Sequence, residues 1–162
     1  MADITFYFCH GQKLHHKLIR FFTRSYWNHV AVTWVSNGNP DDSIYEADFN
    51  GVIATEALAW FKNRHGERIE SLTIYVSDTV ATKFREAILA KLYSPYDFVA
   101  LVGYLFNTRK LNTEKKYFCS ELLAECLKEA GLDIIPSNKE WRVTPGEFYL
   151  AMRGFNFGCG VG

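Results

Sequence analysis

The sequence predicts a single α+β domain in which an antiparallel sheet or a partial barrel packs against amphipathic helices. Short apolar runs rich in β-branched and aromatic residues dominate the first half, and clusters of turn-forming residues separate them closely. Helical periodicity dominates the second half. With 162 residues, 48% of them hydrophobic, the chain can fill one core. We therefore expect one domain over residues 1–162.

The first half begins with a strand and a helix and continues as a strand meander. Val30 to Val35 form a β-branched and aromatic run, and turn formers from Ser36 to Asp42 follow it. Gly51 marks a tight turn between two further strands. The predicted elements are a strand over 4–9, a helix over 12–22, strands over 29–35, 44–47 and 52–55, a helix over 56–62 and a strand over 72–76.

The second half reads as helices joined by polar loops. Asp78 or Thr79 can cap the first helix, and Gly131 suits the C-terminal end of a later one. Thr144 and Glu147 form a capping box. The predicted elements are helices over 78–92, 96–106, 119–130 and 144–152, a polar loop over 107–116 and a flexible Gly-rich tail over 154–162.

Composition narrows the function classes. Lysine plus arginine equal aspartate plus glutamate at 18 each, so the chain lacks the basic excess of a nucleic-acid binder. Polar residues interrupt the first twenty positions, which predicts neither a signal peptide nor an integral membrane segment and favours a cytoplasmic protein as synthesised. The four cysteines fit no disulfide scaffold, and we expect free thiols, no metal and no cofactor.

Cys119 and His29 form the most informative pair of residues. A cysteine at a helix N-terminus meets unpaired backbone N–H groups and the positive end of the helix dipole, which favour its thiolate. A histidine can accept the thiol proton, and Glu46 on the neighbouring strand can orient the imidazole. If His29 faces the Cys119 helix, Ala31 shares that face. The alternative for Cys119 is a small buried hydrophobic side chain, since Cys126 lies on the same helix face.

The order of short motifs resembles the circularly permuted papain-like cysteine peptidases and amidases of the NlpC type. These are the YiiX/YaeF-like proteins, which are related to the lecithin:retinol acyltransferases. In them the histidine precedes the cysteine in the chain. The resemblance spans residues 3 to about 150 and rests on Trp-Asn-His29-Val-Ala-Val, Ile-Tyr-Glu46-Ala, Tyr96-Asp-Phe, Tyr-Phe-Cys119-Ser-Glu-Leu-Leu and Val-Thr-Pro145.

The resemblance implies a permuted papain-like fold with the nucleophile at a helix N-terminus. It implies Cys119 as nucleophile, His29 as base and Glu46 as third member, while Tyr96 would contact the oxyanion or the substrate. The alternative for Tyr96 is a core aromatic. Asn28 replaces a frequent serine or threonine, and Tyr93-Ser94-Pro95 replaces a frequent glycine, which bears on substrate fit.

The implied function is a cysteine hydrolase that cleaves an amide or peptide bond through an acyl-cysteine, with peptidoglycan peptides as one substrate class and a bacterial or phage source as one origin. Two alternatives stay open. One is a lipid acyltransferase or thioesterase on the same fold, and the other is a catalytically silent binding domain. The substrate would be a peptide, peptidoglycan or a lipid-acyl group, and the oligomeric state is not predicted. Four aromatics, Tyr26, Trp27, Tyr96 and Tyr117, can line a substrate groove or fill the core.

Overall fold

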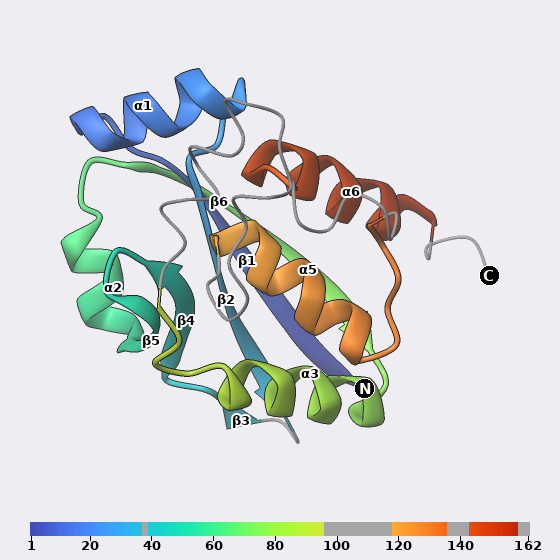
Figure 1. The fold of residues 1–162 in the computed structure, drawn as a ribbon. Helices are drawn as coiled ribbons and strands as arrows, with labels where there is room; N and C mark the ends of the chain where they lie inside the picture. The colour runs from blue at the N-terminus through green and yellow to red at the C-terminus, as the bar shows by residue number, and fades with distance from the viewer. Residues whose placement is uncertain (37–38, 96–117, 136–142, 159–162) are drawn as a thin grey trace.

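The computed structural model describes residues 1–36, 39–95, 118–135 and 143–158, and an antiparallel sheet organises them (Figure 1). Its strands are β1 (Ala2–His10), β2 (His29–Ser36), β3 (Asn39–Pro40), β4 (Ser43–Asp48), β5 (Gly51–Glu56) and β6 (Arg68–Val76). They follow the spatial order β5-β4-β2-β1-β6, and β3 pairs with β2 beside this path. The predicted antiparallel sheet is confirmed, and over these residues it is open rather than a partial barrel.

The pairing of β1 with β2 fixes the position of His29. Cys9 lies opposite His29 in the register of these two strands and opposite Ile69 in β6. The Asn28 N–H donates to the Cys9 carbonyl at 3.0 Å, and the Gly11 N–H donates to Asn28 Oδ1 at 2.7 Å. These bonds tie the start of β2 to the end of β1, so the first residue of β2 is firmly placed.

Three helices cover one face of the sheet and enclose the main core with it. They are α3 (Asp78–Ala90), α5 (Cys119–Glu129) and α6 (Pro145–Gly158), and all lie in front of the sheet in Figure 1. Alternate residues of β1 point to this face, as the period of a strand requires. Among them, Phe6 meets Phe84 of α3 and Phe148 of α6 edge to face, with ring centroids 6.3 and 5.4 Å apart.

A smaller apolar cluster lies on the opposite face, under α2 (Ala57–Asn63). Trp60 of α2 packs there with Ala31 and with Cys9 and Ile44. The expectation that the face of Ala31 is the one against the Cys119 helix is therefore wrong. Val30 and its alternate neighbours in β2 pack with α5 instead. His29 reaches the start of α5 because it lies at the very end of its strand.

Helix and strand boundaries agree with most predictions and correct three of them. The first residue of α3 is Asp78, but its cap is Ser77, whose Oγ accepts from the Val80 N–H at 3.3 Å. Asp78 and Thr79 were therefore the wrong capping candidates. α6 continues to Gly158, so the residues from Gly154 onward that were predicted to begin a flexible tail are helical up to that point. β6 begins four residues before its predicted start, at Arg68.

The ends of α5 and α6 confirm two predicted signals. Gly131, just after α5, has a φ of +91°, the left-handed conformation that favours glycine. The Thr144 Oγ1 accepts from the Glu147 N–H at 3.0 Å, and a Glu147 carboxylate oxygen accepts from the Thr144 N–H at 2.9 Å. The predicted helix over 96–106, the loop over 107–116 and residues 159–162 lie outside the described residues. Within the described ranges, no helix has the length and apolar character needed to cross a bilayer.

Candidate functional site

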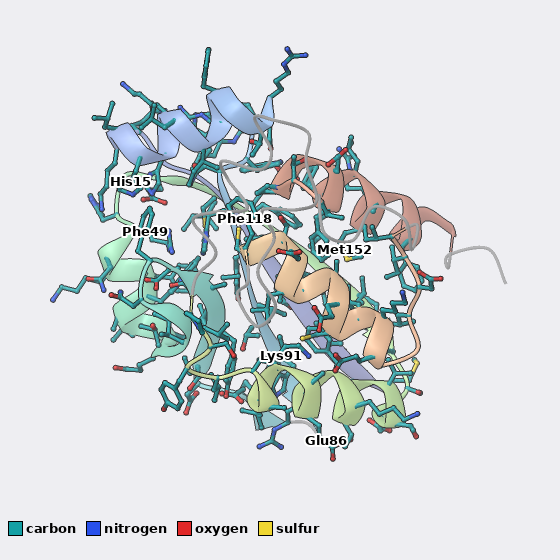
Figure 2. The ribbon with its side chains drawn as sticks, in the orientation of Figure 1. His15, Phe49, Glu86, Lys91, Phe118 and Met152 are labelled. Carbon is teal, nitrogen blue, oxygen red and sulfur yellow. The ribbon has the colours of Figure 1, made fainter. Side chains whose placement is uncertain are left out.

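Cys119 is the first residue of α5, as the sequence predicted, and its side chain is buried with 1% exposure. The preceding residue, Phe118, is extended and caps the helix, and Figure 2 labels it at this end of α5. The Phe118 N–H donates to a Glu121 carboxylate oxygen at 3.4 Å, and Ser120 Oγ donates to the Val143 carbonyl. These contacts anchor the first turn of α5. The N–H of Cys119 has no acceptor within its own helix, because the first four N–H groups of any helix lack one.

His29 lies between the Cys119 sulfur and the Glu46 carboxylate. Its Nε2 lies 2.5 Å from Glu46 Oε2, and its side chain also hydrogen-bonds with Cys119. Because Nε2 is engaged by Glu46, Nδ1 is the ring nitrogen left for the sulfur. The structure thus brings Cys119 together with Glu46 and His29, which lie 73 and 90 positions before it in the chain.

The electrostatics of the pair favour an imidazolium next to a carboxylate. Burial alone would lower the pKa of His29, but the Cys119 sulfur and the Glu46 carboxylate raise it to about 9. Burial alone would raise the pKa of Glu46, but the charges and hydrogen bonds of His29 and Arg64 lower it to about 2. At neutral pH the site therefore holds a protonated imidazole and an ionised Glu46.

Arg64 completes the contacts of Glu46, and sequence analysis did not single it out. It follows the last residue of α2, and its Nη2 donates to Glu46 Oε2 at 2.7 Å. Its Nη1 donates to Glu67 Oε2 at 3.4 Å, and its guanidinium carbon lies 4.6 Å from the centre of the Trp60 ring. In the sequence, Arg64 is recognisable only as a basic residue that follows the predicted helix. Many solvent-exposed side chains have the same position, so this signal does not identify a site residue.

The line of contacting charged groups from His29 through Glu46, Arg64 and Glu67 continues to α1 (Leu14–Thr23). Glu67 Oε1 lies 3.8 Å from His16 Nδ1, and both side chains are more than nine-tenths buried. Burial and the neighbouring positive charges, with His15 first among them, lower the pKa of His16 to about 3. His16 is therefore neutral at physiological pH, and Glu67 finds its positive partner in Arg64.

A cavity of about 350 Å³ opens beside this line of charged groups. Its walls come from α1, from the turn between β4 and β5 and from the α2 segment. His15 and Phe49 both line it and pack edge to face with ring centroids 5.2 Å apart, and Figure 2 labels both. Its polar walls include Asn28, His29 and Arg64. The cavity therefore gives a polar group access to the His29 side of the site.

Other predicted site residues have different outcomes. Tyr96 and Tyr117 lie outside the described residues, as does the predicted polar loop over 107–116. Trp27 is buried in the main core, where its ring contacts Phe8 and Tyr149. Tyr26 is 51% exposed, and its ring packs against His10 at a tilt, with centroids 4.3 Å apart. Neither Tyr26 nor Trp27 lines the cavity beside His29.

Comparison with known proteins supports the family that the motifs indicated. No curated protein matches the chain. The family of permuted papain-like amidase enzymes, YaeF/YiiX, also called the C92 family, matches residues 10–140. This range contains His29, Glu46 and Cys119 and covers most of the described fold. The chain therefore belongs to the permuted papain-like amidases of the YaeF/YiiX family.

Proposed function

We propose that the chain is a cysteine amidase that hydrolyses a peptide-type amide bond, with Cys119 as nucleophile, His29 as acid and base, and Glu46 as the group that orients the imidazole. One observation carries this proposal: the His29 ring hydrogen-bonds with the Cys119 side chain on one side and with Glu46 on the other. This arrangement is the one that thiol-dependent acyl transfer needs.

The reaction would proceed in two halves. The Cys119 thiolate attacks the carbonyl carbon, a C–S bond forms, and negative charge develops on the carbonyl oxygen. The His29 imidazolium then donates its proton to the amide nitrogen as the C–N bond breaks, which releases the amine. In the second half a water molecule attacks the thioester and gives a proton to His29. The acid leaves and the sulfur departs as thiolate.

The start of α5 supplies charge stabilisation for the oxyanion. Because Cys119 is the first helical residue, its N–H is available to a ligand at the positive end of the helix dipole. One such donor is worth about 3 kcal/mol of activation barrier in enzymes that use it. A tyrosine hydroxyl can serve as a second donor, and Tyr96 is the candidate that the sequence motif indicates.

The acyl group bound to Cys119 in the intermediate identifies the substrate class. We propose a peptide substrate, with cell-wall peptides as the first class to test. Incubating the protein with separate wall-peptide and lipid extracts, followed by mass spectrometry of the Cys119 peptide, reads the trapped acyl group directly. A peptidyl adduct supports the proposal, whereas a fatty-acyl adduct would replace it with the lipid acyltransferase or thioesterase alternative.

Variants test the assigned roles. Cys119→Ala and His29→Ala should abolish turnover and adduct formation while the thermal unfolding transition stays cooperative. Cys126→Ala is the matched control, because Cys126 is an equally buried thiol on the same helix. Turnover that survives Cys119→Ala, or that Cys126→Ala removes to the same degree, would contradict the mechanism.

A further inference from the structure

We propose that Arg64 is a positioning residue for this site: it holds the Glu46 carboxylate in one orientation and, through it, the His29 ring. The inference rests on the proposed function for the roles of His29 and Glu46, and it assigns Arg64 no contact with substrate. The inference is based on three contacts that hold the guanidinium group of Arg64 in place.

The guanidinium of Arg64 is held on three sides. One nitrogen donates to Glu46 at 2.7 Å, a second donates to Glu67 at 3.4 Å, and the planar group lies over the Trp60 ring. The side chain is 14% exposed. A fork of fixed donors with a stacked face is a geometry that arginine provides and lysine does not.

Arg64 and His29 share a single oxygen of Glu46. The Oε2 atom accepts from Arg64 Nη2 and also lies 2.5 Å from His29 Nε2. If the Glu46 carboxylate rotated, its contacts with Arg64 and with His29 would both lengthen. The hydrogen bond from Arg64 therefore also holds the carboxylate oxygen in place for His29. The orientation of the imidazole toward Cys119 thus depends on a residue that does not touch either ring nitrogen.

The charges around Glu46 come from several elements and nearly cancel. With His29 protonated, the two cations His29 and Arg64 balance the two carboxylates of Glu46 and Glu67. Loss of Arg64 alone would leave Glu67 buried beside a neutral His16, which is costly. Glu46 interacts directly with His29 on β2, Arg64 after α2 and Cys9 on β1. These groups in turn interact with Cys119 on α5, His16 on α1 and Glu67 before β6.

The same charges give a signature in the pH profile. The positive charge of Arg64 helps to lower the pKa of Glu46, and it also opposes the proton on His29. Without Arg64 the pKa of both groups should rise. The alkaline limb of activity, where His29 loses its proton, should therefore move upward, whereas the pKa of Glu46 at about 2 lies below the pH range of the assay. A residue with a purely structural role would not move the alkaline limb upward.

The test uses Arg64→Met combined with Glu67→Gln, which removes the arginine without stranding a buried carboxylate. Glu67→Gln alone is the reference, and Arg64→Lys keeps the charge without the fork. Arg68→Met is the matched control, since Arg68 also lies near an aromatic ring, that of Tyr26, but does not contact Glu46. The probe is p-nitrophenyl acetate, and the rate at which it acylates Cys119 is measured from pH 5 to pH 10 against a Cys119→Ala blank.

We expect the double variant to acylate about 10- to 100-fold more slowly than Glu67→Gln, with the alkaline limb shifted upward, Arg64→Lys in between, and Arg68→Met unchanged. Adding Glu46→Gln should cause no further fall in the maximal rate, because Arg64 acts through Glu46. An unchanged rate and profile, or an equal fall in the Glu46→Gln background, would overturn the proposal.

A nuclear magnetic resonance titration of the His29 ring separates this inference from the proposed function. If the wild-type chain is not acylated at all, the proposed function fails, but the titration midpoint of His29 still reports on Arg64. An upward shift in the double variant supports the positioning role, and an unchanged midpoint contradicts it.

Discussion

Glu46 Oε2 lies 2.5 Å from His29 Nε2, although 17 residues separate the two side chains in the sequence. β2 and β4 pair in the sheet, so the two residues approach each other from neighbouring strands. Glu46 is 4% exposed and ionised, and the short contact directs the other ring nitrogen toward the start of α5. The sheet therefore presents the imidazole, and the helix presents the sulfur.

Glu46→Gln should narrow the pH range of activity from its alkaline side. An amide oxygen can still accept from His29 Nε2, so the ring stays in place. The pKa of His29 is raised to about 9 by the charges of Cys119 and Glu46, and the variant removes the charge of Glu46. The imidazolium then loses its proton at lower pH, and the alkaline limb moves down. Rates of Cys119 acylation from pH 6 to pH 10 measure this shift. A limb that stays in place would mean that Glu46 does not act on His29 through its charge.

Iodoacetamide at pH 6 should alkylate Cys119 before Cys9 and Cys126. All three thiols are at most 1% exposed, so access is matched and the difference reports on ionisation. Burial raises the pKa of Cys9 far above its usual range and that of Cys126 to about 12, whereas Cys119 hydrogen-bonds with His29.

Peptide mass spectrometry over a time course, in a Cys159→Ser background that removes the thiol of residue 159, gives the order of labelling. The His29→Ala variant is the control, because it should bring Cys119 down to the rate of the other two. Equal rates for all three thiols in the parent protein would count against thiolate formation at the start of α5.

Most of the fold was predictable because local patterns and tertiary packing agree. The apolar periods of β1, β2 and α5 match their buried faces, and Gly131 ends α5 as its position suggested. The end of α6 was not predictable, since glycines usually favour a loop. The structure continues the helix, and Phe155 packs against the main core there. A tertiary contact outweighs the local preference at that point.

Sequence motifs predicted those residues of the site that lie within a motif. Cys119, His29 and Glu46 each lie in a recognisable short motif, so their order indicated the arrangement. Arg64 has no such motif, because it lies in a polar segment with Lys62 and His65 that resembles a solvated surface. Only the three-dimensional structure brings it within 2.7 Å of a carboxylate 18 residues away.

His16 should make the protein sensitive to mild acid. Its pKa is lowered from 6.5 to about 3 by burial first and by nearby positive charges second. The unfolded chain therefore binds a proton below pH 6.5 that the folded chain does not, so stability falls as pH decreases from about 6.5 toward 3. His16→Gln should remove about 1–2 kcal/mol of this loss between pH 7 and pH 5.

Urea unfolding at those two pH values, for the parent protein and for His16→Gln, gives the comparison. His65→Gln is the matched control, because His65 is an exposed histidine two positions before Glu67, the residue that His16 contacts. If the parent and His16→Gln lose equal stability on acidification, His16 does not titrate as the structure indicates.

Gly51→Ala should destabilise the protein more than Gly66→Ala, although both glycines have a positive φ, at +102° and +86°. A Cβ at Gly51 would lie 2.3 Å from the Ser94 carbonyl oxygen, whereas a Cβ at Gly66 would meet no atom within 4 Å. The Ser94 carbonyl accepts from the Val52 N–H at 2.8 Å, so the close approach belongs to a bond that holds β5 and, through β4, the strand of Glu46. We expect the free energy of unfolding to fall by about 1 kcal/mol at Gly66, where only the left-handed backbone is strained. We expect a fall of about 2–4 kcal/mol at Gly51, where steric displacement adds to this strain.

Denaturant unfolding of both variants measures the difference. Equal losses would show that the segment containing Ser94 moves aside freely, and the position of Glu46 would then not depend on this turn.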